Sequence, residues 1–248
     1  MIEKRIAEDT GILVLEYPPQ NYLPEPEFIP VSELKGWIED NHLKALIIAG
    51  SGRHFSGGAS VDALFAMADS AVPMELQMIK GKELLDYVEN LDIPVIAAIN
   101  GVCFGGGLEI ALSCYIRICS ESALFAFPET NIGLMPGLGG TYRLGEQMSP
   151  IDSLKMILGG DMINAEQALV MRLVDTVVKD DDPLSYALHF VRRITEGRPI
   201  KIINYVMQAL KNAKRLSRKE CMLEETRMFC DLARMEANRL KKVKSEEL

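Results

Sequence analysis

The chain has 248 residues, of which 48% are hydrophobic and 25% are charged, and its net charge is −8. A chain of this length buries about 70 to 75% of the surface that it exposes when unfolded, so it can form one large core, with room for an appendage. The acidic balance argues against nucleic-acid binding, because contacts with phosphates need clustered lysine and arginine.

The first residues predict neither export nor membrane insertion. Residues 1–11 lack the apolar stretch of about 7 to 15 residues that a signal peptide contains, and no apolar run reaches the length of about 18 residues that suggests a membrane span. We therefore expect a cytoplasmic protein without a membrane partner.

Short apolar or β-branched runs alternate with helical patterns through most of the chain. Residues 74–91 and the segment after residue 107 repeat apolar side chains with helical spacing. Strands are predicted at 11–17, 45–50, 94–99, 116–120, 123–127 and 173–178. This interleaving of strands and helices predicts an α/β fold.

The pattern changes towards the C-terminus. Asn164 and Gln167 have the spacing of a capping box, which predicts a helix start. After Pro199 the strand patterns stop, and two or three amphipathic helices rich in Met, Leu, Glu and Lys are predicted. We expect an α/β core at 1–198 and a helical region at 199–248. The apolar faces of these helices could cover the chain's own core or contact another subunit.

Three consecutive glycines, Gly105 to Gly107, follow the predicted strand at 94–99, where a helix should begin. A glycine inside a helix lowers the stability of the helix by roughly 1 kcal/mol relative to alanine, so the presence of three glycines here requires an explanation. Free N–H groups and the dipole at a helix start attract negative charge, and a missing Cβ lets a ligand approach the backbone. Either a phosphate or an oxyanion fits. The phosphate-binding patterns G-x-x-x-x-G-K-[ST] and G-x-G-x-x-G do not match these glycines.

Two glutamates accompany glycine-rich segments. Glu109 lies in the first turn of the predicted helix, where the helix dipole alone favours an acidic residue. Glu129 follows the strand at 123–127 and precedes a Gly- and Pro-rich loop, where an ordinary surface charge would also fit. Gly57 and Gly58 could supply another N–H donor from a separate loop. Two N–H donors and two carboxylates together indicate a site that forms and stabilises an enolate.

Other kinds of site have weaker support. The five cysteines form no C-x-x-C pair, so we expect reduced, mostly buried thiols rather than disulfides or a zinc site. The three histidines are scattered, no G-x-S-x-G sequence is present, and the S-x-x-K pattern at 32–35 stands alone. We expect no metal ion and no cofactor.

Four segments, in order along the chain, resemble the enoyl-CoA hydratase/isomerase, or crotonase, superfamily. They are HFSGGASV, IPVIAAINGVCFGGGLEIALSC, ALFAFPETNIGLMPGLGGTYRL and INAEQALVMRLVDTVV. The resemblance implies a spiral of ββα units with a C-terminal helical region, assembled as a trimer or a dimer of trimers. It also implies acyl thioesters of coenzyme A as substrates, so that coenzyme A is part of the substrate and not a cofactor.

The resemblance also implies roles for individual residues. Gly57 and Gly106 match the positions whose backbone N–H groups form an oxyanion hole, and Glu109 and Glu129 match the two catalytic glutamates of hydratases. Further substrate contacts are expected from Arg53, His54, Ser56, Gly58, Ala59, Gly105 and Gly137. Isomerases of the superfamily often lack the first glutamate, so both glutamates together favour a lyase that adds water to, or removes it from, a 2-enoyl/3-hydroxyacyl thioester.

Several departures leave more than one substrate and reaction open. Ser60 and Tyr115 replace acidic residues that are usual in the family, and the segment 18–42 is shorter and richer in proline than the usual region that helps to hold coenzyme A. A thioester on an acyl carrier protein, as in polyketide biosynthesis, is therefore an alternative to an acyl-CoA of fatty acid metabolism. Isomerisation or decarboxylation would use the same oxyanion hole, and a noncatalytic scaffold or RNA-binding role belongs to a different class of function. The sequence does not define the acyl chain or the direction of reaction.

Overall fold

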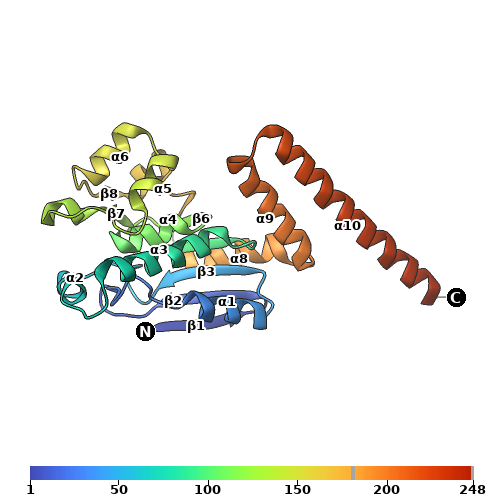
Figure 1. Ribbon diagram of the computed structural model, residues 1–248, viewed down its shortest axis with the longest axis horizontal. Coiled ribbons are helices and arrows are strands. Elements are labelled where there is room, and N and C mark those ends of the chain that lie inside the picture. Colours follow the sequence, from blue (N-terminus) through green and yellow to red (C-terminus); the bar gives the residue numbers. More distant parts are fainter. Residues whose placement is uncertain (180–181, 247–248) are drawn as a thin grey trace. The chain divides into compact units, whose positions relative to one another are not determined.

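The computed structural model describes residues 1–179 and 182–246 and divides into two compact units (Figure 1). The first unit is Met1–Ile194, and the second begins at Thr195. The sequence patterns place the end of the α/β core at residue 198.

A six-stranded sheet forms the centre of the first unit. All its neighbouring pairs are parallel except the first, β1 with β2. Every residue of β2 and of β4 is buried, as expected for strands with both faces covered, which need continuous apolar runs. From edge to edge the strands are β1 (Ile2–Ala7), β2 (Thr10–Leu15), β3 (Ala45–Gly50), β4 (Val95–Ile99), β6 (Ile116–Ser120) and β9 (Thr176–Val178).

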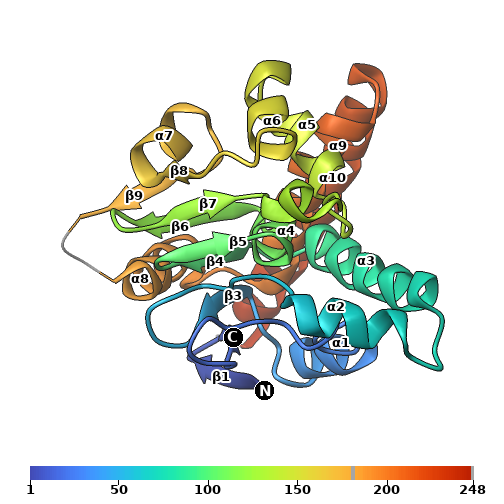
Figure 2. The same ribbon diagram turned by 90° about the vertical axis from the view of Figure 1, so that its left-hand side faces the viewer.

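A second sheet consists of three short strands, β5 (Val102–Phe104), β7 (Leu124–Ala126) and β8 (Ile163–Asn164). β5 and β7 are parallel, and β8 is antiparallel to β7. β4, β5 and helix α4 (Gly106–Ser113) form a ββα unit whose two strands belong to different sheets (Figure 2). β6 and β7 are again consecutive strands in different sheets. This arrangement agrees with the predicted α/β class.

The remaining helices of the first unit surround the sheets. Helix α8 (Pro183–Thr195) packs Ala187 and Val191 into a core with residues of β3, β4 and β6. Helix α4 contacts both β4 and β5, and it also contacts helices α3 and α5. The other helices are α1 (Val31–Asp40), α2 (Val61–Ala68), α3 (Met74–Asn90), the 3-10 helix η1 (Pro128–Ile132), α5 (Gly140–Gln147), α6 (Pro150–Ile157) and α7 (Ala165–Val170).

Most of the helices and strands that the sequence predicts are present in the structure. All six predicted strands are present, the helix predicted at 74–91 is α3, and α7 begins with the predicted capping box of Asn164 and Gln167. Three strands were not predicted. β1 is an edge strand with exposed charged residues, which hide its alternation, whereas β5 and β8 have only 3 and 2 residues. Such short strands depend on their partners and leave no period to detect.

The five cysteines all lie within the described residues, and all are free. Cys103, Cys114 and Cys119 are buried, whereas Cys221 and Cys230 are partly exposed. Burial raises the pKa of the Cys114 and Cys119 thiols to about 12. Such thiols remain protonated at neutral pH and act as small apolar side chains.

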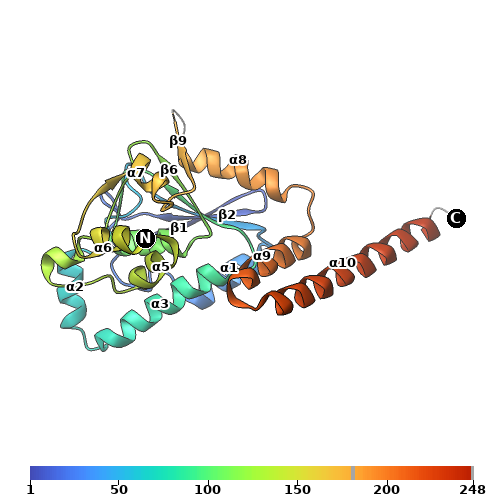
Figure 3. The same cartoon turned by 90° about the horizontal axis from the view of Figure 1, so that it is seen from above.

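Between Thr195 and Glu246 the second unit contains two helices, α9 (Ile200–Arg215) and α10 (Arg218–Glu246), which Figure 3 shows from another side. Asp231 of α10 connects them: its carboxylate accepts a hydrogen bond from the Tyr205 hydroxyl at 2.7 Å and pairs with Lys201 at 2.5 Å. Several apolar side chains of the two helices are exposed, including Val206, Leu210, Met222, Leu223 and Phe229.

We expect these exposed apolar side chains to bring copies of the chain together, since unburied apolar area favours association. Deletion of the residues after Leu216 should give monomers or aggregate in sedimentation experiments. Phe229→Glu should weaken assembly without breaking α10, and Lys219→Glu on the same helix is the control, because it changes charge without removing an apolar side chain. A full-length chain that sediments as a monomer at micromolar concentration would contradict the prediction.

Candidate active site

Three chain segments meet at one edge of the second sheet. β5 continues directly into Gly105 and α4, and its parallel neighbour β7 continues into η1, which carries Glu129. The N–H of Gly105 donates to the carbonyl of Ala126 at 3.0 Å, so the pairing extends to the strand ends. On the other side of β5, Ser56 pairs with Cys103. The loop after β3, the glycine turn and η1 are therefore adjacent because their strands are neighbours.

These segments line a cavity of about 490 Å³. Its apolar wall comes mainly from α2, α3 and the loop after η1, and it includes Leu64, Met67, Met74, Met78, Leu134 and Met135. Among the described residues, the charged side chains of the lining are all acidic: Glu25, Glu109 and Glu129. Glu25 is exposed, so the cavity suits an apolar group next to the less exposed carboxyls of Glu109 and Glu129.

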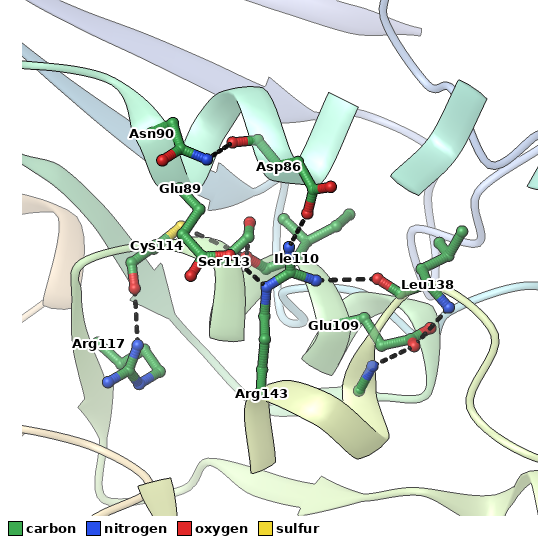
Figure 4. A network of polar contacts seen from close by, with 11 residues as sticks. Asp86, Glu89, Asn90, Glu109, Ile110, Ser113, Cys114, Arg117, Leu138 and Arg143 are labelled. Carbon is green, nitrogen blue, oxygen red and sulfur yellow. Dashed lines mark hydrogen bonds and ion pairs between the residues drawn. The ribbon is translucent and has the colours of Figure 1, made fainter. Parts of the chain in front are cut away.

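Glu109 lies in the first turn of α4 and is only 2% exposed. One of its oxygens, Oε1, accepts hydrogen bonds from the backbone N–H groups of Leu138 at 2.6 Å and Gly140 at 2.8 Å (Figure 4). Burial raises the pKa of the Glu109 carboxyl, whereas these two hydrogen bonds and the positive charge of Arg143 act in the opposite direction. The side chain is thus an interior group held at one oxygen, not a solvated charge on a helix.

Glu129 has different surroundings. Its Oε2 is buried and has no hydrogen-bond partner among the residues that the structure describes. Burial, and to a lesser extent the negative charge of Glu109, raise the pKa of the Glu129 carboxyl to about 7, although the local backbone favours ionisation. Two carboxyls in one cavity therefore have distinct environments, which is the arrangement that acid–base chemistry uses.

The three consecutive glycines differ in what a Cβ at each position would contact. Gly105 has φ +51°, and a Cβ there would lie 2.9 Å from Oε1 of Glu129. A Cβ on Gly107 would lie 2.6 Å from the carbonyl oxygen of Ser56. Gly106 has an ordinary φ, and its Cβ would come no closer than 3.6 Å to its nearest neighbour, Leu23. Packing thus requires glycine at two of the three positions, whereas Gly106 borders open cavity space.

The two predicted oxyanion-hole donors also differ. Gly106 is the first residue of α4, so its N–H has no acceptor within the helix, and the residue lines the cavity. Gly57 lines the cavity too, but its N–H donates to the carbonyl of Gln20 at 2.8 Å. The oxyanion-hole role expected of both N–H groups stays a prediction, although the N–H of Gly57 already has a backbone acceptor. A ligand oxygen there would have to share or displace the bond to Gln20.

The predicted substrate contacts divide into two groups. Ala59, Gly105 and Gly137 line the cavity, and Arg53, His54, Ser56 and Gly58 do not. Arg53 and His54 instead border a separate hollow of about 400 Å³ beside Pro18 and Pro19.

Three of the residues outside the lining, His54, Ser56 and Gly58, support the loop that reaches the cavity. Nδ1 of His54 accepts the N–H of Val102 at 3.1 Å. The Ser56 hydroxyl donates to the carbonyl of Asn21 at 2.7 Å and accepts the N–H of Gly58 at 3.1 Å. Gly58 has φ +80°, and a Cβ there would lie 2.7 Å from the carbonyl oxygen of Phe104. These three residues therefore have structural roles, and their expected contacts with a substrate stay a prediction.

Two structural residues of this region were missed by the sequence patterns. Asn21 is fully buried with φ +52°, and its side chain donates to the carbonyls of Ser51 and His54. Asn is among the few residues other than glycine that adopt such a φ readily, which is the signal that could have identified it. Arg143 is also buried, and nothing in its local sequence indicates that. Ser60, where the family usually has an acid, caps α2 by accepting the N–H of Ala63 at 3.1 Å.

Residues 1–179 and 182–246 offer neither a metal site nor a membrane span. No group of three or more His, Cys, Asp and Glu side chains in these ranges is arranged to hold a metal ion. Within the same ranges, the helices are too short or too polar to cross a membrane.

Residues 31–245 match the enoyl-CoA hydratase/isomerase family. The chain is 34% identical over 184 residues to the probable enoyl-CoA hydratase of Bacillus subtilis, a match that covers 73% of this chain and 70% of that protein. It is 38% identical over 178 residues to the fatty acid oxidation complex subunit alpha of Idiomarina loihiensis. That match covers 69% of this chain but 25% of the relative, so the chain corresponds to about a quarter of that larger protein.

A solved structure of an enoyl-CoA hydratase subunit from Geobacillus kaustophilus has the same fold. It superimposes with a TM-score of 0.81 at 29% sequence identity, and the match covers 99% of this chain and 95% of that chain. The predicted crotonase-like α/β fold with a helical C-terminal region is therefore confirmed.

Replacement of Glu129 by Gln should stabilise the fold at alkaline pH. The folded-state pKa of about 7 lies above the ordinary value of 4.5, so the wild type loses stability as pH rises between these values, because the unfolded chain releases the Glu129 proton in this range while the folded chain retains it. The uncharged variant avoids this loss. From about pH 4 to about pH 8 its free energy of unfolding should gain about 1 to 3 kcal/mol relative to the wild type.

Denaturant unfolding of both proteins at these two pH values measures the difference. Glu121→Gln is the control, because Glu121 is an exposed side chain whose removal should leave the pH dependence unchanged. A Glu129→Gln protein whose stability falls with pH as steeply as that of the wild type would contradict the prediction.

Proposed function

The chain belongs to the enoyl-CoA hydratase/isomerase family, a family of enzymes, and we propose that it adds water to a 2-enoyl thioester or removes it from the 3-hydroxyacyl thioester. One observation supports the hydratase reaction above all. Glu109 and Glu129 line the same apolar cavity, one with an oxygen held by two N–H groups and the other with a buried oxygen that has no partner among the described residues.

Hydration needs a base and an acid on the two carbons of the double bond. Glu109 accepts a proton from water while the water oxygen bonds to Cβ, and the π electrons move towards the thioester oxygen. The N–H of Gly106 donates to that oxygen as negative charge develops on it. Glu129, protonated, then delivers a proton to Cα, and the carbonyl re-forms. A carboxyl with a pKa of about 7 is suited to this exchange at neutral pH.

The nature of the cavity supports an uncharged acyl group. Its wall contains methionines from α2, α3 and the loop after η1, and Met side chains adapt to irregular apolar shapes. We take coenzyme A as the carrier, because the relative from Bacillus subtilis carries the name of an enoyl-CoA hydratase. Fatty acid metabolism is the proposed setting, and a trimer or a dimer of trimers is the proposed assembly. Turnover of the acyl carrier protein thioester alone would instead support a role in polyketide biosynthesis.

The oxyanion role of Gly106 can be tested by comparing two neighbouring glycines. Gly106→Ala should change the free energy of unfolding by less than about 1 kcal/mol, because its Cβ fits and its φ is ordinary. The same Cβ would narrow the space in front of the N–H, so kcat should fall by up to about 10² to 10³, the effect of losing one such donor.

Gly105→Ala is the matched comparison and should destabilise the fold by about 1 to 3 kcal/mol, since its φ is +51° and its Cβ would meet Glu129. Stopped assays for kcat and denaturant unfolding for stability measure both variants. A folded Gly106→Ala protein with the wild-type kcat would remove Gly106 from the site.

The two glutamates can be tested with crotonyl, longer and branched 2-enoyl thioesters, on coenzyme A and on acyl carrier protein, with product analysis by mass spectrometry. Glu109→Gln and Glu129→Gln should each lower the hydration rate by about 10² to 10⁴, and the double variant should lose much less than the product of both. Hydration should also decline as pH rises through about 7, because Glu129 must be protonated, and Glu129→Gln should lose this decline.

Exchange of the Cα proton of a bound saturated thioester with deuterium separates the roles. We expect Glu129→Gln to abolish the exchange and Glu109→Gln to retain more of it. The opposite result would reverse the assignment. Wild-type hydration by both variants would refute the hydratase proposal, and retained 3-enoyl isomerisation by Glu109→Gln without any hydration by the wild type would indicate an isomerase.

A further inference from the structure

Arg143 on α5 is 2% exposed, yet each of its three guanidinium nitrogens donates to a different acceptor (Figure 4). Nε donates to Glu89 and Nη2 donates to Asp86, both at 2.8 Å and both on α3. Nη1 donates to the backbone carbonyl of Leu138 at 2.9 Å. The planar, fixed arrangement of donors in arginine allows three such bonds from one side chain, which lysine cannot reproduce.

Leu138 connects this guanidinium to the candidate base. Its carbonyl accepts from Arg143, and its N–H donates to Oε1 of Glu109 at 2.6 Å. The next residue, Gly139, has φ +98°, and a Cβ there would lie 2.5 Å from Nη1 of Arg143. Gly140 then supplies the second N–H to Glu109. The turn at 138–140 therefore lies between the guanidinium and the carboxylate and contacts both.

We propose that Arg143 is a positioning residue for Glu109: it fixes the 138–140 turn, and the turn holds Oε1 so that Oε2 is directed at the reacting water. This inference rests on the proposed hydratase function for the role of Oε2. The same guanidinium ties the turn to α3, whose Met74 and Met78 line the cavity. The guanidinium therefore joins the turn that holds the base to a helix that also lines the cavity.

Arg143 acts on Glu109 through its positive charge as well as through the 138–140 turn. Arg143 and Lys82 favour the ionised carboxylate, whereas burial disfavours it. Replacing Arg143 by an uncharged residue should therefore raise the pKa of Glu109 and move the acid limb of the pH–kcat/KM profile to higher pH. The charged groups that face Glu109, directly or across Arg143, are Lys82, Asp86 and Glu89 on α3, Glu129 on η1 and Arg143 on α5.

Arg143→Met and Arg143→Lys separate geometry from charge. Arg143→Met should lower kcat by about 10²-fold, because small displacements of a catalytic group have effects of this size, and should shift the acid limb upward. Arg143→Lys keeps the charge but not the three-way contact. It should lower kcat by about tenfold with the acid limb unmoved, and KM should change by less than about twofold in both variants.

Arg117→Lys is the matched control. Arg117 is also buried, and it donates to the carbonyls of Cys114 and Leu173 and pairs with Asp175, but no hydrogen bond or ion pair joins it to Glu109 or to the 138–140 turn. A merely structural loss should appear in Arg117→Lys as reduced stability, with kcat per folded molecule and the acid limb unchanged. A lower kcat of equal size in Arg117→Lys would overturn the positioning role.

A second readout does not depend on activity. The carboxyl ¹³C resonance of Glu109, assigned by its loss in Glu109→Gln, reports the titration of this group in the ligand-free protein. It should titrate at higher pH in Arg143→Met than in the wild type or in Arg117→Lys. If the wild type hydrates no thioester, the proposed function fails, while this titration still tests the link between Arg143 and Glu109.

Two further results would overturn the proposal. One is an unchanged Glu109 titration in folded Arg143→Met. The other is a wild-type kcat in Arg143→Lys, which also decides the matter if Arg143→Met does not fold.

Discussion

Burial of two carboxyl groups in one largely apolar cavity is the constraint on which the site depends. A carboxylate removed from water needs compensating hydrogen bonds or it binds a proton. Glu109 receives two N–H groups from the 138–140 turn, whereas the buried Oε2 of Glu129 receives none from the described residues. The chain thus supplies hydrogen bonds to the carboxyl of Glu109 and leaves the carboxyl of Glu129 with a pKa of about 7, close to neutral pH. This difference follows from backbone placement, because N–H groups and not charged side chains contact Glu109 directly.

The backbone placement comes from the second sheet. β5 and β7 are only 3 residues long, but their parallel pairing brings the start of α4 and the 3-10 helix η1 to the same edge. Neither strand would persist alone, and each directly follows a strand of the larger sheet, β4 before β5 and β6 before β7. The large sheet therefore supplies stability, and the small sheet supplies the geometry of the site.

Sequence patterns identified what depends on local chemistry. The long strands, α3, the capping box of α7 and the glycine-rich turn before Glu109 all follow from residue type and spacing. The glycine-rich segments directed attention to Glu109 and Glu129 together, the resemblance to a family gave them roles, and the structure places both in one cavity. The sequence does not show which N–H groups already donate to another acceptor in the folded chain. The bond from Gly57 to Gln20 joins segments far apart in the chain, and so does the contact of Arg143 with α3. Neither leaves a periodic or compositional signal.

The glycine turn shows why residue type alone does not assign function. Three identical residues stand in a row, yet Gly105 is needed for its backbone conformation and for the space that Glu129 occupies, and Gly107 is needed for the close approach of Ser56. An alanine at Gly106 would meet only ordinary van der Waals contacts, so folding gives the weakest reason for glycine there. The missing Cβ at Gly106 leaves free space next to an N–H that has no helical acceptor. Of the three glycines, the one that packing needs least is therefore the one that ligand binding explains best.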